Sequence, residues 1–310
     1  MLLRGRGLRN SAGWVAANVL RYSGRIDRTH SAISASQAVL SIYFHNPGRK
    51  LFSRIVGWLS DKGYRFLSCE DVLGFIDSAE PFPTGSAFIS FDDAWRDNLT
   101  EVIPLVMESD LPVTIFVATA EVQRGFYWFS QAQKHSALLP EPYRSDVRRL
   151  WKIPEPTRRA VVDQLFHKTQ TPAREVMTVE EVAEIAKLPQ VTIGSHSVNH
   201  AILPNCDDQL LCDEVTGSKQ QLETWTGRPV RFFSYPNGDF DVRTSSVLAE
   251  AGYQLGFTTE NRVMRVSDPR FYLPRFSVMD DGSFTENLCH ALGLWTPVVE
   301  GFKRAIRRIS

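Results

Sequence analysis

Cysteine, an excess of charge and long apolar runs are all scarce in this sequence of 310 residues. Its four cysteines include no C-x-x-C pair, which argues against a disulfide scaffold and favours reduced thiols in a cytoplasmic protein. Lys and Arg number 35, as do Asp and Glu, so the net charge gives no reason to expect a nucleic-acid partner, and we expect none. No run reaches the roughly 18 apolar residues that a transmembrane helix requires.

The N-terminal stretch MLLRGRGLRNSAGWVAANVL has a basic start but no sustained apolar segment, because Asn10, Ser11 and Asn18 interrupt it. No A-x-A-like cleavage site follows cleanly, so the stretch does not read as a secretory signal. We therefore expect a cytoplasmic location.

Beyond about residue 36, short apolar runs alternate with helical patterns. This alternation predicts a parallel sheet with right-handed crossovers, either open or closed into a barrel. In such folds the reactive groups lie at the C-terminal ends of the strands. The expected strands are 37–44, 86–91, 112–118, 190–194, 230–234 and 253–257, and the expected helices are 49–62, 68–76, 97–108, 178–187, 207–225 and 241–251.

Three segments fall outside this alternation. Residues 120–176 carry several Pro and many Arg and indicate a helical insertion within a barrel domain that spans residues 37–282. Residues 1–36 hold six Arg in their first 28 positions, and residues 283–310 end in GFKRAIRRIS, so both termini predict basic amphipathic helices. Such helices either lie on an anionic membrane surface or pack on the barrel, and the sequence leaves both open.

Charged and polar residues follow two of the expected strands. Strand 86–91 ends in Asp92-Asp93, and strand 190–194 runs into His196-Ser-Val-Asn-His200. Taken singly, the two carboxylates are typical of a turn or a helix cap, and the histidines of a surface. Together, two His and one Asp at separate strand ends form a three-ligand set with open positions, which is typical of a catalytic metal site. The remaining carboxylate would then serve as a general base toward water.

A third strand, 230–234, ends in Ser-Tyr-Pro-Asn-Gly, with Tyr235 and Asn237 inside the turn. The segment reads either as a simple Pro-Asn-Gly turn or as a rigid loop at the same strand-end opening. In the second interpretation its backbone N–H groups bind an oxyanion.

Four segments resemble the polysaccharide deacetylase family, also called the NodB-homology family or carbohydrate esterase family four. They are FISFDDAWRDN (88–98), GSHSVNH (194–200), FFSYPNGDFD (232–241) and YLPRFSV (272–278), and the resemblance covers about residues 37–280. It implies an α/β fold, a distorted (β/α) barrel, and metal-dependent removal of N- or O-acetyl groups from a glycan or amino sugar. By motif, Asp92 matches the catalytic base, whereas Asp93, His196 and His200 match the metal ligands, for which Zn²⁺ is the expected ion.

The sequence departs from the family pattern at two places. The R-x-P-Y-G motif reads S-Y-P-N-G here, so the arginine that orients the base is missing, and Arg275 of the L-P-R-F segment is the expected replacement beside Asp92. The family's motif for the general acid is the second departure. His290 fits the family's L-x-H letters but follows a helix start, so we expect His45, at the end of the first strand, to protonate the leaving amine.

Two alternatives to a glycan deacetylase remain from the sequence. One is a catalytically inactive, carbohydrate-binding barrel, against which the retention of both Asp92 and Asp93 counts. The other, compatible with the first reading, is a deacetylase of a lipid-linked glycan at the membrane surface, favoured by the basic termini.

Overall fold

A computed structural model describes residues 3–295, with side chains from residue 13 onward. Within these residues, eight strands form a single sheet, in the order β7-β6-β5-β4-β3-β1-β8 with β2 paired to β3, and every strand pair is parallel. Each expected strand is present, with both ends within two residues of the prediction. The strands are β1 (Val39–Phe44), β2 (Arg65–Leu67), β3 (Ser86–Asp92), β4 (Val113–Val117), β5 (Val191–Ser195), β6 (Phe232–Ser234), β7 (Leu255–Phe257) and β8 (Phe276–Ser277).

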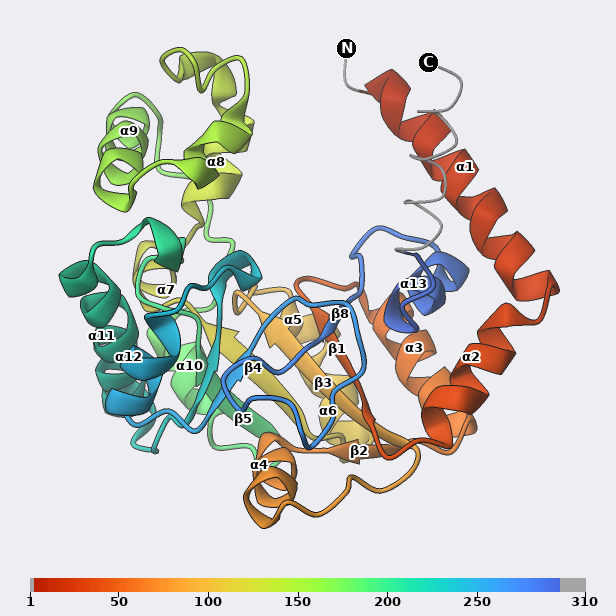
Figure 1. Cartoon of the computed structure of the whole chain (residues 1–310). Helices are drawn as coiled ribbons and strands as arrows, with labels where there is room; N and C mark the ends of the chain where they lie inside the picture. The colour runs from red at the N-terminus through yellow and green to blue at the C-terminus, as the bar shows by residue number, and fades with distance from the viewer. Residues whose placement is uncertain (1–2, 296–310) are drawn as a thin grey trace.

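The segment from residue 270 to residue 277 joins the two ends of this curled sheet. Leu273 donates its backbone N–H to Gly256 of β7, and three residues later β8 begins its pairing with β1. Gly256 is required here, because a Cβ atom would come within 2.7 Å of the Phe271 carbonyl oxygen. The sheet therefore curls into the distorted barrel that the sequence predicts (Figure 1).

Alternate residues of the strands feed two apolar layers, because successive side chains point to opposite faces of a sheet. One layer packs between the sheet and the surrounding helices, with Ile42, Ile89 and Ile193 among its members. The other fills the inside of the curl, where Phe88 and Phe257 stack with ring centres 5.2 Å apart. This inner layer packs beneath the C-terminal ends of the strands and supports them.

Helices cover the outside of the sheet (Figure 1). The expected helix 97–108 is two helices, because the chain bends at Val102 and Pro104 lacks the N–H that a continuous helix would use. Strands β2 and β8 were not expected, since runs of three and two residues carry no readable alternation. The covering helices are α3 (Arg49–Asp61), α4 (Cys69–Ser78), α5 (Asn98–Glu101), α6 (Ile103–Glu108), α10 (Val179–Ile185), α11 (Asp208–Thr226) and α12 (Thr244–Glu250).

Between β4 and α10 the chain leaves the barrel to form α7 (Thr119–Arg124), α8 (Trp128–Lys134), α9 (Glu155–His167) and two short 3-10 helices. Together, α8 and α9 and the intervening chain project beyond the strand ends (Figure 1). This insertion packs around an apolar centre of its own, in which Trp128, Leu150 and Leu165 are buried.

The N-terminal residues form α1 (Leu3–Tyr22) and α2 (Arg25–Ser34), and α1 lies along α13 (Phe284–Ala291) (Figure 1). Ala17 and Leu20 supply the buried face of α1. The final part of the expected basic tail, residues 296–310, lies outside the described residues. Within the described part of the chain, no helix combines the length and apolar character needed to cross a membrane.

Candidate active site

A cavity of about 870 Å³ opens at the C-terminal ends of the strands. The insertion closes one side of it, with Phe129, Arg148, Trp151 and Lys152 in its wall. Parallel topology explains the gathering, because every parallel strand delivers its carboxyl end to the same edge. The sequence-predicted residues that line the cavity are His45, Asp92, Asp93, His196, His200 and Asn237.

Asp92 ends β3 and is almost completely buried, with 2% of its surface exposed. Arg275, fully buried in the segment that closes the sheet, donates to both carboxylate oxygens, each at 2.8 Å. The guanidinium also donates to the hydroxyls of Ser90 and Ser234 and to the carbonyl of Thr258, so it has acceptors on every nitrogen. The structure thus brings together the pair that the sequence analysis expected.

The Arg275 guanidinium decides the charge of Asp92. Burial acts to raise the pKa of this carboxyl, but the charge and hydrogen bonds of Arg275 outweigh burial and lower the pKa below its usual value. Asp92 is therefore ionised at neutral pH and still borders the cavity.

The three predicted metal ligands converge beside Asp92. Asp93 Oδ1 lies 3.6 Å from His196 Nε2 and 3.5 Å from His200 Nε2, and all three side chains are buried. His196 Nδ1 is 2.7 Å from the Ser234 carbonyl, to which it must donate, so its Nε2 carries the lone pair. Such a backbone contact fixes the tautomer of a metal-binding histidine.

The residues fit a divalent cation. Asp93 Oδ1 is buried, has no hydrogen-bond partner, and faces two ring nitrogens at distances too long for good hydrogen bonds. Burial raises the pKa of Asp93 and holds that of His200 well below its usual value, because both side chains are shielded from solvent. One carboxylate with two imidazoles is a donor set typical of catalytic zinc.

Aromatic side chains hold the Asp93 turn in place. Asp93 and Ala94 adopt left-handed φ angles of 78° and 47°, which such residues keep only where surroundings fix them. Trp95 Nε1 donates to Asp93 Oδ2, and Tyr127 donates its hydroxyl to the Asp93 carbonyl at 2.8 Å. Neither aromatic was among the predicted site residues, although Trp95 lies in the segment FISFDDAWRDN and Tyr127 begins the Tyr-Trp-Phe run at 127–129.

His45 follows β1 and borders the same cavity. Asp280 lines the cavity beside it and accepts the Asn46 backbone N–H at 2.9 Å. Burial raises the pKa of Asp280, while the neighbouring His45 acts in the opposite direction. By contrast, His290 lies inside α13, as expected, with its ring centre 5.1 Å from that of Trp295, and does not line the cavity.

The two predicted residues of the loop after β6 lie differently with respect to the cavity. Tyr235 does not line the cavity; its backbone N–H donates to Phe257 of β7 and its hydroxyl donates to Phe271. Neither group is available to a substrate, because sheet pairing and the closing segment already use both. Asn237 does line the cavity, at the left-handed φ of 58° that asparagine tolerates.

This chain belongs to the polysaccharide deacetylase family. The family profile described as polysaccharide deacetylase matches residues 79–256, more than half of the chain. That match agrees with the resemblance found in the four sequence segments.

Two curated relatives are distant in sequence. A putative polysaccharide deacetylase, YxkH of Bacillus subtilis, is 21% identical over 212 residues, which cover 68% of this chain and 58% of that protein. A poly-beta-1,6-N-acetyl-D-glucosamine N-deacetylase of Staphylococcus aureus is 20% identical over 250 residues, 77% of this chain and 73% of that protein. The chain thus spans less than two thirds of the Bacillus relative.

Two solved structures share the fold. The Streptococcus pyogenes deacetylase PplD, in complex with acetate, superposes with a TM-score of 0.60 at 18% identity, over 82% of this chain and 97% of that one. IcaB from Ammonifex degensii gives a TM-score of 0.59 at 17% identity, with the same coverage. The likeness confirms the predicted barrel of the polysaccharide deacetylase type.

Proposed function

We propose that this protein is a metal-dependent hydrolase that removes N-acetyl or O-acetyl groups from a glycan or amino sugar. One observation carries the proposal: the unpartnered Asp93 oxygen faces two histidine nitrogens beside Asp92, which Arg275 keeps ionised. Only hydrolysis needs the second, non-ligating carboxylate, whereas a binding module needs neither. Family membership supports the same reaction class.

Asp93, His196 and His200 would hold the divalent metal, for which Zn²⁺ is the first candidate. When bound, the metal would polarise the acetyl carbonyl and lower the pKa of water. Asp92 then accepts the proton of the attacking water. Its two oxygens accept from Arg275 and retain further lone pairs, so the ion pair orients the base without consuming it.

Two other cavity residues complete the reaction. His45 donates a proton to the leaving nitrogen, because an amine anion is too poor a leaving group to depart unassisted. The backbone N–H near Asn237 stabilises the negative charge that develops on the carbonyl oxygen. Both side chains line the cavity with Asp92, which supports these assignments.

The substrate is an acetylated glycan or amino sugar. Trp95, Phe129 and Trp151 give the cavity aromatic walls, which suit the apolar faces of sugar rings. One named relative acts on poly-beta-1,6-N-acetyl-D-glucosamine, and we extend to this chain only the class, an N-acetylated sugar polymer.

Acetate release from N-acetylglucosamine oligomers tests the proposal. Purified protein should release acetate, lose this activity after chelator treatment and dialysis, and regain it with one equivalent of Zn²⁺. Oligomers that bind while no acetate appears with any added divalent metal would instead identify the inactive, carbohydrate-binding alternative.

We propose in addition that α1 and α2 contact an anionic lipid surface, where a lipid-linked glycan would meet the site. Opposite its buried face, α1 exposes four large apolar side chains, and exposed arginines follow them. Aromatic residues beside cations are typical of segments at membrane interfaces, and each arginine near an anionic surface contributes about 1 kcal/mol. The exposed residues are Trp14, Val15, Val19, Tyr22, Arg21, Arg25 and Arg28.

Co-sedimentation with vesicles containing phosphatidylglycerol tests this contact. Wild type should bind at low salt and dissociate as salt rises, because the Debye screening length falls to about 8 Å at physiological ionic strength. Trp14→Ser with Tyr22→Ser should weaken binding, whereas Met107→Ser, on exposed α6, should not. Equal binding to neutral vesicles would contradict the proposal. The cytoplasmic location expected from the sequence stays a prediction.

A further inference from the structure

The turn that carries both histidines is conformationally costly. Between β5 and the following loop, Ser197 and His200 adopt left-handed φ angles of 65° and 45°. Residues other than glycine pay of order 1–3 kcal/mol for such angles and keep them only where neighbouring groups hold them. Backbone donors of α7 hold part of the turn, since Thr119 and Ala120 donate to the carbonyls of Ser197 and Val198.

Glu214 of α11 holds the remaining part. Its carboxylate accepts the Asn199 backbone N–H at 2.8 Å and the Asn199 side-chain amide at 2.7 Å. Asn199 immediately precedes the ligand His200. Glu214 is 1% exposed and does not line the cavity, so it touches the turn and not the substrate.

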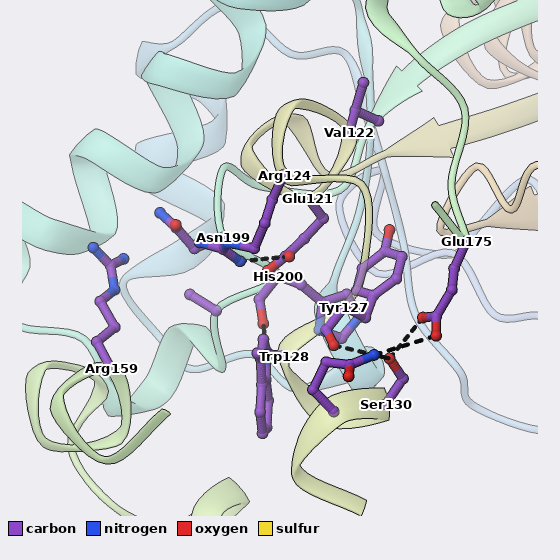
Figure 2. A network of polar contacts seen from close by, with 12 residues as sticks. Glu121, Val122, Arg124, Tyr127, Trp128, Ser130, Arg159, Glu175, Asn199 and His200 are labelled. Carbon is purple, nitrogen blue, oxygen red and sulfur yellow. Dashed lines mark hydrogen bonds and ion pairs between the residues drawn. The ribbon is translucent and has the colours of Figure 1, made fainter. Parts of the chain in front are cut away.

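The insertion reaches the same turn from the other side. Arg159 of α9 donates to Glu214 and, at 3.0 Å, to the buried Glu155. Arg158 pairs with Glu155 and lies 3.9 Å above the Trp128 ring, whose Nε1 donates to the His200 carbonyl. Figure 2 shows Arg159 extending from its helix toward Asn199, and Trp128 against the backbone of His200.

We propose that Glu214 is a positioning residue for the metal-binding turn, and that Arg159 makes the insertion part of this support. The inference deepens the proposed function and depends on its metal site. Glu214 fixes the backbone between the two histidines, and Arg159 fixes the Glu214 carboxylate. The turn is therefore held in the metal-binding geometry before any metal arrives.

Zinc affinity is the direct readout, measured by competition with a zinc-binding indicator. Glu214→Gln keeps the size of the side chain but replaces one acceptor oxygen with a donor, which must face either Asn199 or Arg159. We expect its zinc affinity to fall about 10–100-fold, the loss typical when groups that orient metal ligands are changed. Arg159→Met should lose less, but more than twofold. The control Asp213→Asn changes the adjacent, exposed residue of α11 and should stay within twofold of wild type.

A second readout separates positioning from folding. The visible absorption of the Co²⁺-loaded protein should change in Glu214→Gln and Arg159→Met but not in Asp213→Asn, while the metal-free variants keep wild-type circular dichroism. Zinc affinity and Co²⁺ spectrum unchanged in folded Glu214→Gln would overturn the inference. If that variant does not fold, unchanged values in Arg159→Met overturn it. Wild type that binds no zinc would instead overturn the proposed function itself.

Discussion

The strand-end side of the cavity and its insertion side are built differently. On the strand-end side, the side chains with proposed roles come from the residue after β1, from the end of β3 and from the turn after β5, and Arg275 comes from the closing segment. The insertion contributes aromatic and cationic wall residues. Behind them, Trp128 donates to the backbone of the histidine turn, and Arg159 reaches the turn through Glu214 of α11.

Because of this difference, we expect the two sides to respond differently to substitution. Strand ends hold their residues through sheet hydrogen bonds, so changing one side chain removes one chemical role and leaves the frame. The insertion acts through packed side chains, so substitutions in it should alter the geometry of the histidine turn only gradually. Large, specific losses belong to the first side and graded losses to the second.

The largest effect is expected for a metal ligand. His200→Ala should lose both bound metal and acetate release, because the described site supplies only three protein ligands. Metal analysis of the purified variant beside an activity assay checks this. Full metal occupancy with normal turnover would contradict the metal site proposed on the strand-end side.

The next effect concerns His45. His45→Gln should lower the rate on an N-acetylated sugar by about 10²–10⁴-fold, the usual contribution of a general acid, and leave metal content unchanged. On an aryl acetate the loss should be far smaller, because that leaving group departs without a proton. His290→Gln, inside α13, should change neither rate. An equal loss on both substrates in His45→Gln would mean that the proton comes from elsewhere.

Stability distinguishes the buried arginine from an exposed one in the same segment. Arg275→Met leaves the Asp92 carboxylate buried without its partner, which should lower the free energy of unfolding by about 3–5 kcal/mol. Arg270→Met breaks only an exposed pair with Asp77, expected to matter by less than about 1 kcal/mol. Denaturant unfolding of both variants measures the contrast, and equal losses would contradict it.

On the insertion side, Glu121 of α7 should make stability depend on pH. Burial raises its pKa to about 7, although Arg124 acts in the opposite direction. The folded state therefore binds this proton more tightly than the unfolded chain. The contribution of Glu121 to the free energy of unfolding is fully present below about pH 4.5 and is lost as pH rises through about 7. The total loss is of order 3 kcal/mol.

Unfolding at pH 5 and pH 8 tests this assignment. Glu121→Gln should flatten the difference between the two conditions, whereas Glu184→Gln, on the exposed face of α10, should not. The contrary result is a free energy of unfolding that rises between pH 5 and pH 8 in wild type and falls in neither variant. That result would show that Glu121 stays ionised in the folded protein.

The two sides also differ in how well the sequence predicted them. Asp92, Asp93, His196 and His200 were predictable, because each ends or follows an apolar run whose direction the strand–helix alternation fixes. Arg275 was predictable as a partner for Asp92 only by the resemblance, since β8 is too short to show a pattern.

The insertion side was not predictable residue by residue. Glu155, Arg158 and Glu214 read as exposed helix residues, and only tertiary packing buries them with one another. The place of Tyr235 outside the cavity was not predictable either, because the motif does not show that Phe257 of β7 and Phe271 accept hydrogen bonds from its N–H and its hydroxyl.

Two adjacent carboxylates give the most direct test of the proposed mechanism. Asp92→Asn and Asp93→Asn each replace a carboxylate with an amide, at two neighbouring residues that are both buried. Metal content and acetate release should separate them: Asp92→Asn keeps one divalent metal per chain and loses activity about 10²–10⁴-fold, whereas Asp93→Asn loses both. Equal metal loss in both variants, or normal turnover in Asp92→Asn, would contradict the division of a base from a metal ligand.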